Sequence, residues 1–514
     1  MNQTEVTANV DEYGNTRLFN IARRTFDLLK IRSVSTPPSR LDVEKINSCI
    51  DYITKDLDKN LGYQVHEYVN DAGINFKVLE VYFNGYKDNR DGGLLMFGHV
   101  DVVDGTDEQF KPFFVNNSLP EEKVYDMDKI GELFSSELYG RGAKDMKSGV
   151  SVQVEIMNAL AVRYAKEKEQ NNNVKVPNVR LLIEPDEEIG SFNGLAKYIS
   201  EYKPRPDIAW TADPARYHGI VVKEKGAVRY VFDIAKKGKA LGKAFDLYRK
   251  IRDEWDKAKW EMDGKTTAKA YESVIYKTGE SGYVYSHSLE DFVFGFELPM
   301  KTDTESMSKL DALRAYINHM GNGCRLDVER KDDKLEAKVH IKGQPNHASR
   351  TFLSECAFEK AADVYEHINS LFSDAVFRYN HVSLNIDLRF SEKRDYTEIE
   401  NWILKLMSKE EFSESVDMVK GIYVPPAYTS ENHANYGLIE NFQSAVNDVE
   451  NNPVRLISSC GASTARLFSE MGIPFVNYGQ KGDGHHSNPE YVVISSLQDV
   501  FDAGMNFVTQ YLGK

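Results

Sequence analysis

The chain has 514 residues, a formal net charge of −15 and 41% hydrophobic residues. This length predicts two or more domains, and the apolar content is sufficient for a sizeable core. The negative charge argues against nucleic acid and anionic membranes as main partners. The N-terminus lacks the pattern of a secretory signal, and no segment approaches the roughly 20 apolar residues of a membrane helix, so we expect a cytoplasmic protein.

Apolar residues recur at helical spacing between Leu18 and Leu29 and again between Ile46 and Leu57, which predicts two amphipathic helices. Further on, short apolar runs end in polar residues and predict buried strands. These runs are 93–98, 179–183, 208–211 and 475–478. A helical pattern over 150–166 separates the first two. Strands that alternate with helices predict an α/β fold with a mostly parallel sheet.

The middle of the chain has a different pattern. Long helical patterns and alternating segments such as 335–341 and 382–390 predict an α+β domain inserted into the first one. We expect a catalytic domain formed by residues 1–215 and 425–514 and a lid domain formed by residues 216–424. The spacing of the four cysteines, Cys49, Cys324, Cys356 and Cys460, favours reduced thiols over a disulfide framework.

Residues that commonly bind metals follow several of the predicted strands. They are His99, Asp145, Glu187, Glu188, Asp213 and either His485 or His486. Each alone has an ordinary explanation, because a Glu-Glu pair is often a solvated surface and Asp before Pro is often a turn. Together they occur where the carboxyl ends of parallel strands form a ligand-binding crevice. Imidazole and carboxylate ligands without cysteine suit zinc, cobalt or manganese at a hydrolytic site.

The motifs around these residues resemble those of the M20 family of metallopeptidases and deacylases. They are Gly98–Val103 (GHVDVV), Tyr139–Lys147 (YGRGAKDMK), Asp186–Ser191 (DEEIGS), Asp213, and the stretch from Gly472 to Glu490. Their order agrees over almost the whole chain. The long insert and the segment Leu335–Ser349 are most similar to the V-type dipeptidases.

The resemblance implies two Zn²⁺ ions, with cobalt or manganese as alternatives, bridged by Asp145. His99 and Asp213 would complete one ion, and Glu188 and His486 the other. His486 is preferred to His485 because it lies four residues before Glu490. The resemblance also implies a cis peptide bond between Asp145 and Met146.

Four further residues receive roles from the resemblance. Asp101 would hydrogen-bond His99 and fix its tautomer, and Glu187 would be the general base that activates a metal-bridging water. In the lid, His347 would support the tetrahedral oxyanion, and Arg389 would bind the terminal carboxylate of the substrate. The same family contains dimers that share a lid histidine and V-type monomers, so a monomer and a homodimer formed through the lid both remain open.

These observations predict a metal-dependent hydrolase that cleaves the peptide bond of dipeptides or short peptides with a free C-terminal carboxylate. An N-acyl-amino-acid or N-succinyl-amino-acid deacylase is the alternative that uses the same site. A binding or scaffold protein with an inactive site is disfavoured, because Glu187 and all the metal positions are intact. The expected partner is a small peptide substrate, and neither nucleic acid nor a membrane is expected.

Overall fold

The computed structural model describes residues 17–512 with internal gaps. The gaps comprise residues 37–40, 117–118, 125–135, 214–218, 236–238, 258–260, 263–265, 268–271, 278–290, 300–303, 332–333, 344–356, 378–380, 391–395, 409–411, 413–415 and 460. The chain divides into two compact units. The first unit is Met1–Glu224 with Ala427–Lys514, and the second, inserted unit is Lys225–Pro426.

Two helices open the described part of the first unit. Residues 17–29 are helical and α2 spans Val43–Lys55, so both helices predicted from the apolar spacing are confirmed. Asp42 caps α2 by accepting a hydrogen bond of 3.1 Å from the backbone N–H of Lys45, a contact that typically stabilises a helix by about 1 kcal/mol. Across the described residues, every helix is too short or too polar to cross a lipid bilayer.

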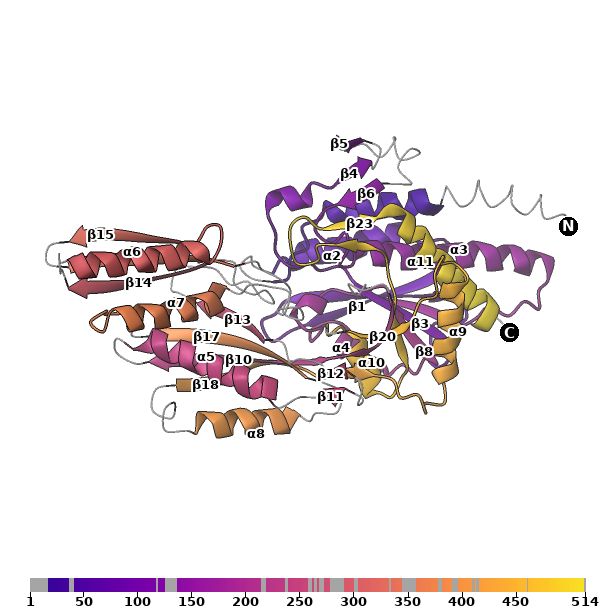
Figure 1. Ribbon diagram of the computed structural model, residues 1–514. Helices are drawn as coiled ribbons and strands as arrows, with labels where there is room; N and C mark the ends of the chain where they lie inside the picture. The colour runs from indigo at the N-terminus through magenta and orange to yellow at the C-terminus, as the bar shows by residue number, and fades with distance from the viewer. Residues whose placement is uncertain are drawn as a thin grey trace. The chain divides into compact units, whose positions relative to one another are not determined.

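The first unit is built on a nine-stranded sheet (Figure 1). Its order is β1 (Leu61–Val69), β2 (Asn75–Phe83), β7 (Val179–Glu184), β3 (Leu94–His99), β8 (Ile208–Thr211), β21 (Phe475–Asn477), β9 (Ile220–Glu224) and β19 (Ala427–Tyr428), with β20 (Leu456–Ser459) also paired to β9. The central strands β7, β3, β8 and β21 are parallel. The predicted α/β class with a mostly parallel central sheet is therefore confirmed.

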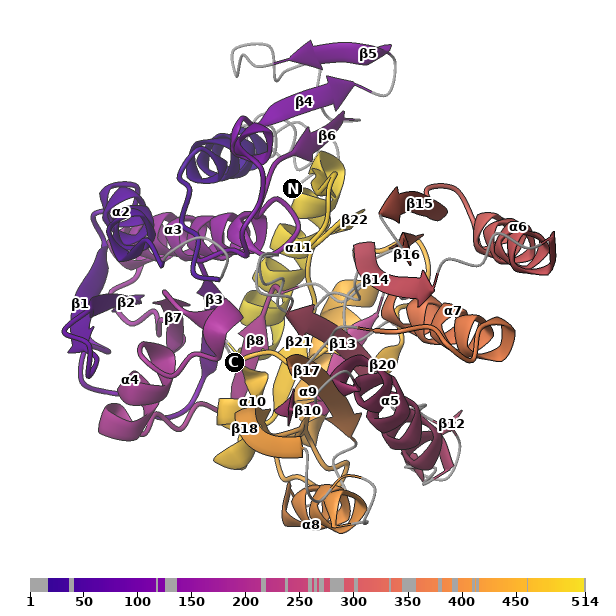
Figure 2. The same cartoon turned by 90° about the vertical axis from the view of Figure 1, so that its left-hand side faces the viewer.

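Helices cover both faces of this sheet (Figure 2). They are α3 (Lys147–Gln170), α9 (Tyr436–Asn447) and α11 (Ile494–Phe507) on one face, and α4 (Leu195–Tyr202) and α10 (Ala465–Glu470) on the other. In β3, Leu94 and Met96 join the first core, while Leu95 and Phe97 join the second. Because both faces are buried, the strand reads as a continuous apolar run rather than an alternating one.

A small antiparallel sheet lies beside the main one and brings distant segments together. Its order is β22 (Gly482–Asp483), β23 (Tyr491–Val493), β6 (Ser136–Tyr139), β4 (Phe113–Asn116) and β5 (Leu119–Val124). The pairing of β23 with β6 places Tyr491 opposite Tyr139. As a result the loop after β6 and the loop before β23 meet, and both loops contribute to the site described below.

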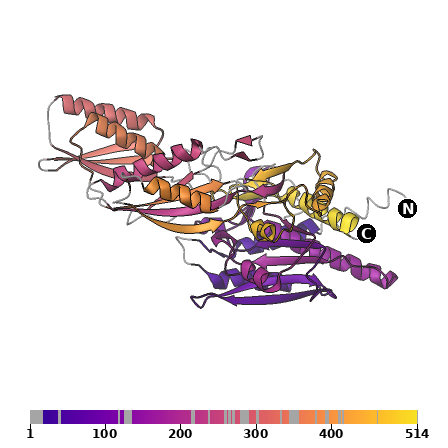
Figure 3. The same cartoon turned by 90° about the horizontal axis from the view of Figure 1, so that it is seen from below.

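In its described residues, the inserted unit contains two larger antiparallel sheets, one two-stranded hairpin and four helices. The sheets are β13 (Glu272–Lys277), β17 (His381–Phe390), β10 (Gly226–Ala235) and β18 (Val416–Val424), and β14 (Asp291–Pro299), β16 (Lys334–Lys342) and β15 (Arg325–Lys331). Its helices are α5 (Ala240–Lys257), α6 (Thr304–His319), α7 (Ala357–Leu371) and α8 (Tyr396–Met407). Helix α5 packs on the first sheet, and α6 and α7 pack on the second (Figure 3). A short hairpin of β11 (Glu261–Met262) and β12 (Thr266–Thr267) completes the described elements.

The described cysteines agree with the expectation of reduced thiols. Cys49 and Cys324 are buried and free. Cys356 and Cys460 lie outside the described residues.

Candidate metal centre

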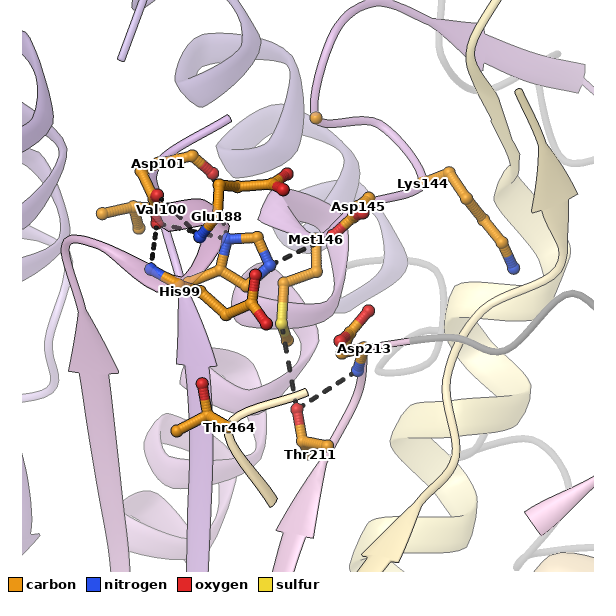
Figure 4. Close-up of polar contacts among 12 residues, drawn as sticks. His99, Val100, Asp101, Lys144, Asp145, Met146, Glu188, Thr211, Asp213 and Thr464 are labelled. Carbon is orange, nitrogen blue, oxygen red and sulfur yellow. Dashed lines mark hydrogen bonds and ion pairs between the residues drawn. The ribbon is translucent and has the colours of Figure 1, made fainter. Parts of the chain in front are cut away.

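The residues that could bind metals gather at the carboxyl ends of the central parallel strands (Figure 4). His99 is the last residue of β3, Glu188 follows β7, and Asp213 follows β8. Asp145 lies just before α3, and His486 lies in the loop after β22. In a parallel α/β sheet this edge is the usual place for ligands, because the loops that leave the strands can converge there.

Two groups of three ligands share Asp145. The first group is His99, Asp145 and Asp213, and the second is Asp145, Glu188 and His486. Within each group the ligand atoms all lie within 4.8 Å of one another. The structure thus brings together all five residues expected to bind metal, and Asp145 stands where a bridging ligand would be needed.

The distances are compatible with ligands that converge on a small space. His99 Nε2 lies 3.0 Å from Asp145 Oδ1, and His486 Nε2 lies 3.2 Å from Asp145 Oδ2. His486 Nε2 is also 3.0 Å from Glu188 Oε2. His486 has a φ of +57°, and the neighbouring His485 belongs to neither group of described ligands.

The loop that carries Asp145 is held by Glu490. The Glu490 carboxylate accepts hydrogen bonds from the backbone N–H groups of Gly142, Lys144 and Asp145 at 3.1, 2.9 and 3.1 Å. It also accepts one of 2.6 Å from Arg141 Nη1. The peptide bond between Asp145 and Met146 is cis, as the family resemblance implies. Sequence reasoning used Glu490 only to choose between two histidines and gave it no role of its own.

Asp101 is fully buried and contacts both His99 and the segment after β7. His99 Nδ1 lies 2.9 Å from the backbone carbonyl of Asp101 and 3.4 Å from its Oδ1 atom. His99 Nδ1 is therefore bound by the backbone carbonyl of Asp101, which leaves Nε2 of His99 available to a metal. The carboxylate itself accepts hydrogen bonds from the backbone N–H groups of Glu187 and Glu188 and from the Ser35 hydroxyl.

The buried carboxylates at the centre have shifted pKa values. Burial raises the pKa of Asp213 to about 8, and the nearby Asp145 carboxylate adds to this effect. Burial also raises the pKa of Glu188. Burial alone would raise the pKa of Asp145 too, but hydrogen bonds to His486 and His99 hold it well below its ordinary value. Divalent cations would relieve the same crowding of buried carboxylates, so the residues present fit a pair of metal ions.

Glu187 lies beside the two groups, and among the described residues it belongs to neither. It begins the short helix η3 (Glu187–Ile189) directly before the ligand Glu188. Burial raises the pKa of Glu187 well above its ordinary value, and the nearby His99 opposes that rise. A carboxylate that borders a metal site is placed to accept a proton from a metal-activated water.

The two residues expected in the lid are placed less fully. Arg389 lies on β17, where its backbone is paired with Ala227 of β10. His347 lies outside the described residues.

Comparison with solved structures finds the same fold in several peptidases. Human carnosine dipeptidase 1 matches with a TM-score of 0.56 and 13% identity, over 98% of this chain and 99% of that one. The metallo-carboxypeptidase Sso-CP2 of Sulfolobus solfataricus matches with a TM-score of 0.55 and 15% identity, over 96% and 99%. The di-peptidase Dug1p of Saccharomyces cerevisiae matches with a TM-score of 0.55 and 12% identity, over 99% and 97%. No curated protein sequence matches the chain.

Identities this low show a shared fold alone, so the family assignment depends on the sequence itself. The sequence profile of peptidase family M20/M25/M40 matches residues 95–512, which is most of the chain, and the protein therefore belongs to this family of metal-dependent peptidases.

Proposed function

We propose that this protein is a zinc-dependent dipeptidase, or an exopeptidase of short peptides, that cleaves the peptide bond next to a free C-terminal carboxylate. The observation that carries the proposal is that two ligand groups share Asp145 while Glu187 lies beside them. Two proteins of similar fold are named as dipeptidases, which supports a dipeptide substrate.

Two Zn²⁺ ions bound by the two ligand groups would polarise the scissile carbonyl and lower the pKa of a water molecule towards about 7. Glu187 takes a proton from the attacking water, whose oxygen then bonds to the carbonyl carbon. Glu187 delivers this proton to the leaving nitrogen as the C–N bond breaks, which gives an amine and a carboxylic acid. The acid then loses the second proton of the water to the amine or to solvent and becomes a carboxylate. Asp101 holds the backbone of Glu187 in place through its carboxylate.

The sequence motifs give two further residues proposed roles toward the substrate. We assign His347 to support the negative charge that develops on the carbonyl oxygen. We assign Arg389 to bind the terminal carboxylate of the substrate, because a guanidinium group offers two parallel donors to a carboxylate. These two assignments rest on the sequence motifs, since the structure does not describe either side chain.

The test is a substrate panel assayed with and without a chelator. It should contain dipeptides, the same dipeptides with an amidated C-terminus, longer peptides and N-acyl amino acids, with zinc, cobalt or manganese added back after chelation. We expect chelator-sensitive cleavage of the free dipeptides and little cleavage of their amides. Cleavage of the N-acyl amino acids alone would refute the proposed substrate class, and cleavage that survives full removal of metal would refute the proposed mechanism.

A further inference from the structure

Lys144, the residue before the shared ligand Asp145, contacts the loop that carries His486. Lys144 is only 2% exposed, and its Nζ donates a hydrogen bond of 2.6 Å to the backbone carbonyl of Gln480. In return, Gln480 Nε2 donates one of 2.7 Å to the backbone carbonyl of Lys144. Gln480 is 1% exposed. In Figure 4 the Lys144 side chain extends away from Asp145 toward the pale-yellow C-terminal part of the chain. We call this reciprocal pair of hydrogen bonds the Lys144–Gln480 clasp.

A second anchor lies on the other side of His486. Glu490 accepts hydrogen bonds from the backbone N–H groups of Lys144 and Asp145 at 2.9 and 3.1 Å. The segment from Gln480 to Glu490 is thus joined to the Asp145 loop at both of its ends. His486 lies between the two anchors, and its imidazole faces Asp145 and Glu188.

The backbone of His486 has a conformation that must be held by its surroundings. Its φ of +57° is in the left-handed region, which residues with a side chain rarely adopt. Such a conformation persists only where the surrounding structure imposes it. If one anchor were lost, the segment could relax and move the imidazole away from Asp145 and Glu188. His99 and Asp213 would not follow, because they extend directly from the central strands β3 and β8.

We propose that Lys144 and Gln480 are positioning residues for the second metal ion, the one assigned to Asp145, Glu188 and His486. The clasp holds His486 in its strained conformation, so its loss weakens the second ion much more than the first. This inference rests on the proposed metal ligands. It assigns the buried lysine a structural task that depends on its length and its donor group, rather than any contact with substrate.

The test measures metal binding and needs no substrate. The metal-free full-length protein is titrated with Zn²⁺ by calorimetry, and the bound zinc is counted by elemental analysis. In Lys144→Met the stem length is kept and the donor is lost. We expect the dissociation constant of the second ion to rise by about 10- to 100-fold, the usual effect of removing a partner that orients a ligand, while that of the first changes by less than about threefold. Gln480→Ala, which removes the other half of the clasp, should give the same split.

Lys481→Met is the matched control. Lys481 is on the same segment, but its Nζ binds Glu450 at 2.8 Å and its side chain is 42% exposed. The Lys481→Met variant should bind both ions with the affinity of the wild type. Circular dichroism and the thermal midpoint of each metal-free variant show whether it folds, and Gln480→Ala keeps the test usable if Lys144→Met does not.

Three results would overturn the inference. Wild-type affinity for both ions in Lys144→Met and Gln480→Ala would show that the clasp does not position His486. Equal weakening of both ions, or the same weakening in Lys481→Met, would show a general loss of packing instead. If the wild type takes up fewer than two ions, the assignment of the metal ligands is wrong, and the role of the clasp fails with it. This outcome differs from failure of the clasp alone, in which the wild type and the variants all bind two ions with the same affinity.

Discussion

The carboxylate of Asp101 accepts a hydrogen bond of 3.0 Å from the backbone N–H of Glu187. Its other oxygen accepts one of 3.1 Å from the backbone N–H of Glu188 and one of 2.7 Å from the Ser35 hydroxyl. One buried carboxylate therefore fixes the start of the segment that provides both the expected base and a metal ligand. Its own backbone carbonyl holds His99.

Asp101→Asn tests this relationship. The variant keeps the size of the side chain, but its NH₂ group replaces an oxygen that accepts a hydrogen bond. This NH₂ group therefore faces another donor. We expect kcat on a dipeptide to fall by about 10- to 100-fold at saturating zinc, with a stability loss of about 1–3 kcal/mol. Ser35→Ala removes one donor to the same carboxylate and should have a much smaller effect on kcat. Equal effects of the two variants would mean that Asp101 does not control the position of Glu187.

Glu187→Gln separates proton transfer from metal binding. Glu187 is in neither ligand group of the described residues, so the variant should still bind two ions. The loss of a general base should lower kcat by about 10²- to 10⁴-fold while KM changes little. The neighbouring Glu188→Gln is the contrasting variant, because it should lose one ion. If Glu187→Gln retained the activity of the wild type, another group would have to be the base.

The fold class could be predicted because the central strands are buried on both faces. The apolar run 179–183 forms β7 (Val179–Glu184). A short apolar run between helical patterns is typical of a strand that is buried on both faces of a parallel sheet. The small sheet was not predicted. Its strands are short, and its pairing of Tyr139 with Tyr491 depends on a contact between distant parts of the chain, which local patterns do not record.

At the site, too, some residues could be predicted from the sequence and others could not. The candidate ligands could be identified because each follows a strand or precedes a helix in a recognisable motif. The residues that hold them could not be identified in the same way. Glu490 accepts hydrogen bonds from the Asp145 loop, and Lys144 donates one to Gln480, but 336 positions of sequence separate the residues of that last pair. Such contacts follow from the packing of loops and leave no periodic pattern in the sequence.

The stabilisation of the protein by zinc should grow as the pH rises. Without metal, burial raises the pKa of Asp213 to about 8 from its ordinary value of 3.8. A raised pKa of this kind contributes stability at low pH, and that contribution is lost as the pH rises toward 8. Zinc binds the charged form of Asp213, so it competes with the proton and binds more tightly as the pH rises. The stabilisation by zinc depends on this apparent affinity, so it grows as the pH rises toward 8.

The measurement is the thermal midpoint with and without zinc at about pH 6, 7 and 8. The gap between the two midpoints should widen across this series. Magnesium at the same concentration is the control for general ionic effects, because Mg²⁺ prefers oxygen ligands and dehydrates reluctantly. A gap that stays constant or narrows would contradict the assignment of Asp213 as a ligand.

Glu80 provides a prediction far from the metal centre. Its buried carboxylate accepts hydrogen bonds from Tyr198 at 2.6 Å and from Arg90 Nη2 at 2.9 Å, lies 2.8 Å from His66 Nε2 and contacts Arg180. Burial alone would raise the pKa of Glu80, but these partners lower it to about 2 from its ordinary value of 4.5. A lowered pKa stabilises the fold above pH 4.5, and this contribution of about 3 kcal/mol is lost as the pH falls toward 2.

Glu80→Gln should therefore destabilise the protein by about 3 kcal/mol or more at neutral pH, because it also leaves buried guanidinium groups without their partner. The difference from the wild type should shrink by about 2 kcal/mol at about pH 3, where the wild-type carboxylate begins to bind a proton in the folded state but is almost fully protonated in the unfolded state. Urea unfolding at each pH measures this difference. Tyr198→Phe, which removes a neutral donor to the same carboxylate, should shift stability by about 1 kcal/mol and leave most of the pH dependence in place. A penalty for Glu80→Gln that is the same at both pH values would mean that the Glu80 charge does not stabilise the fold.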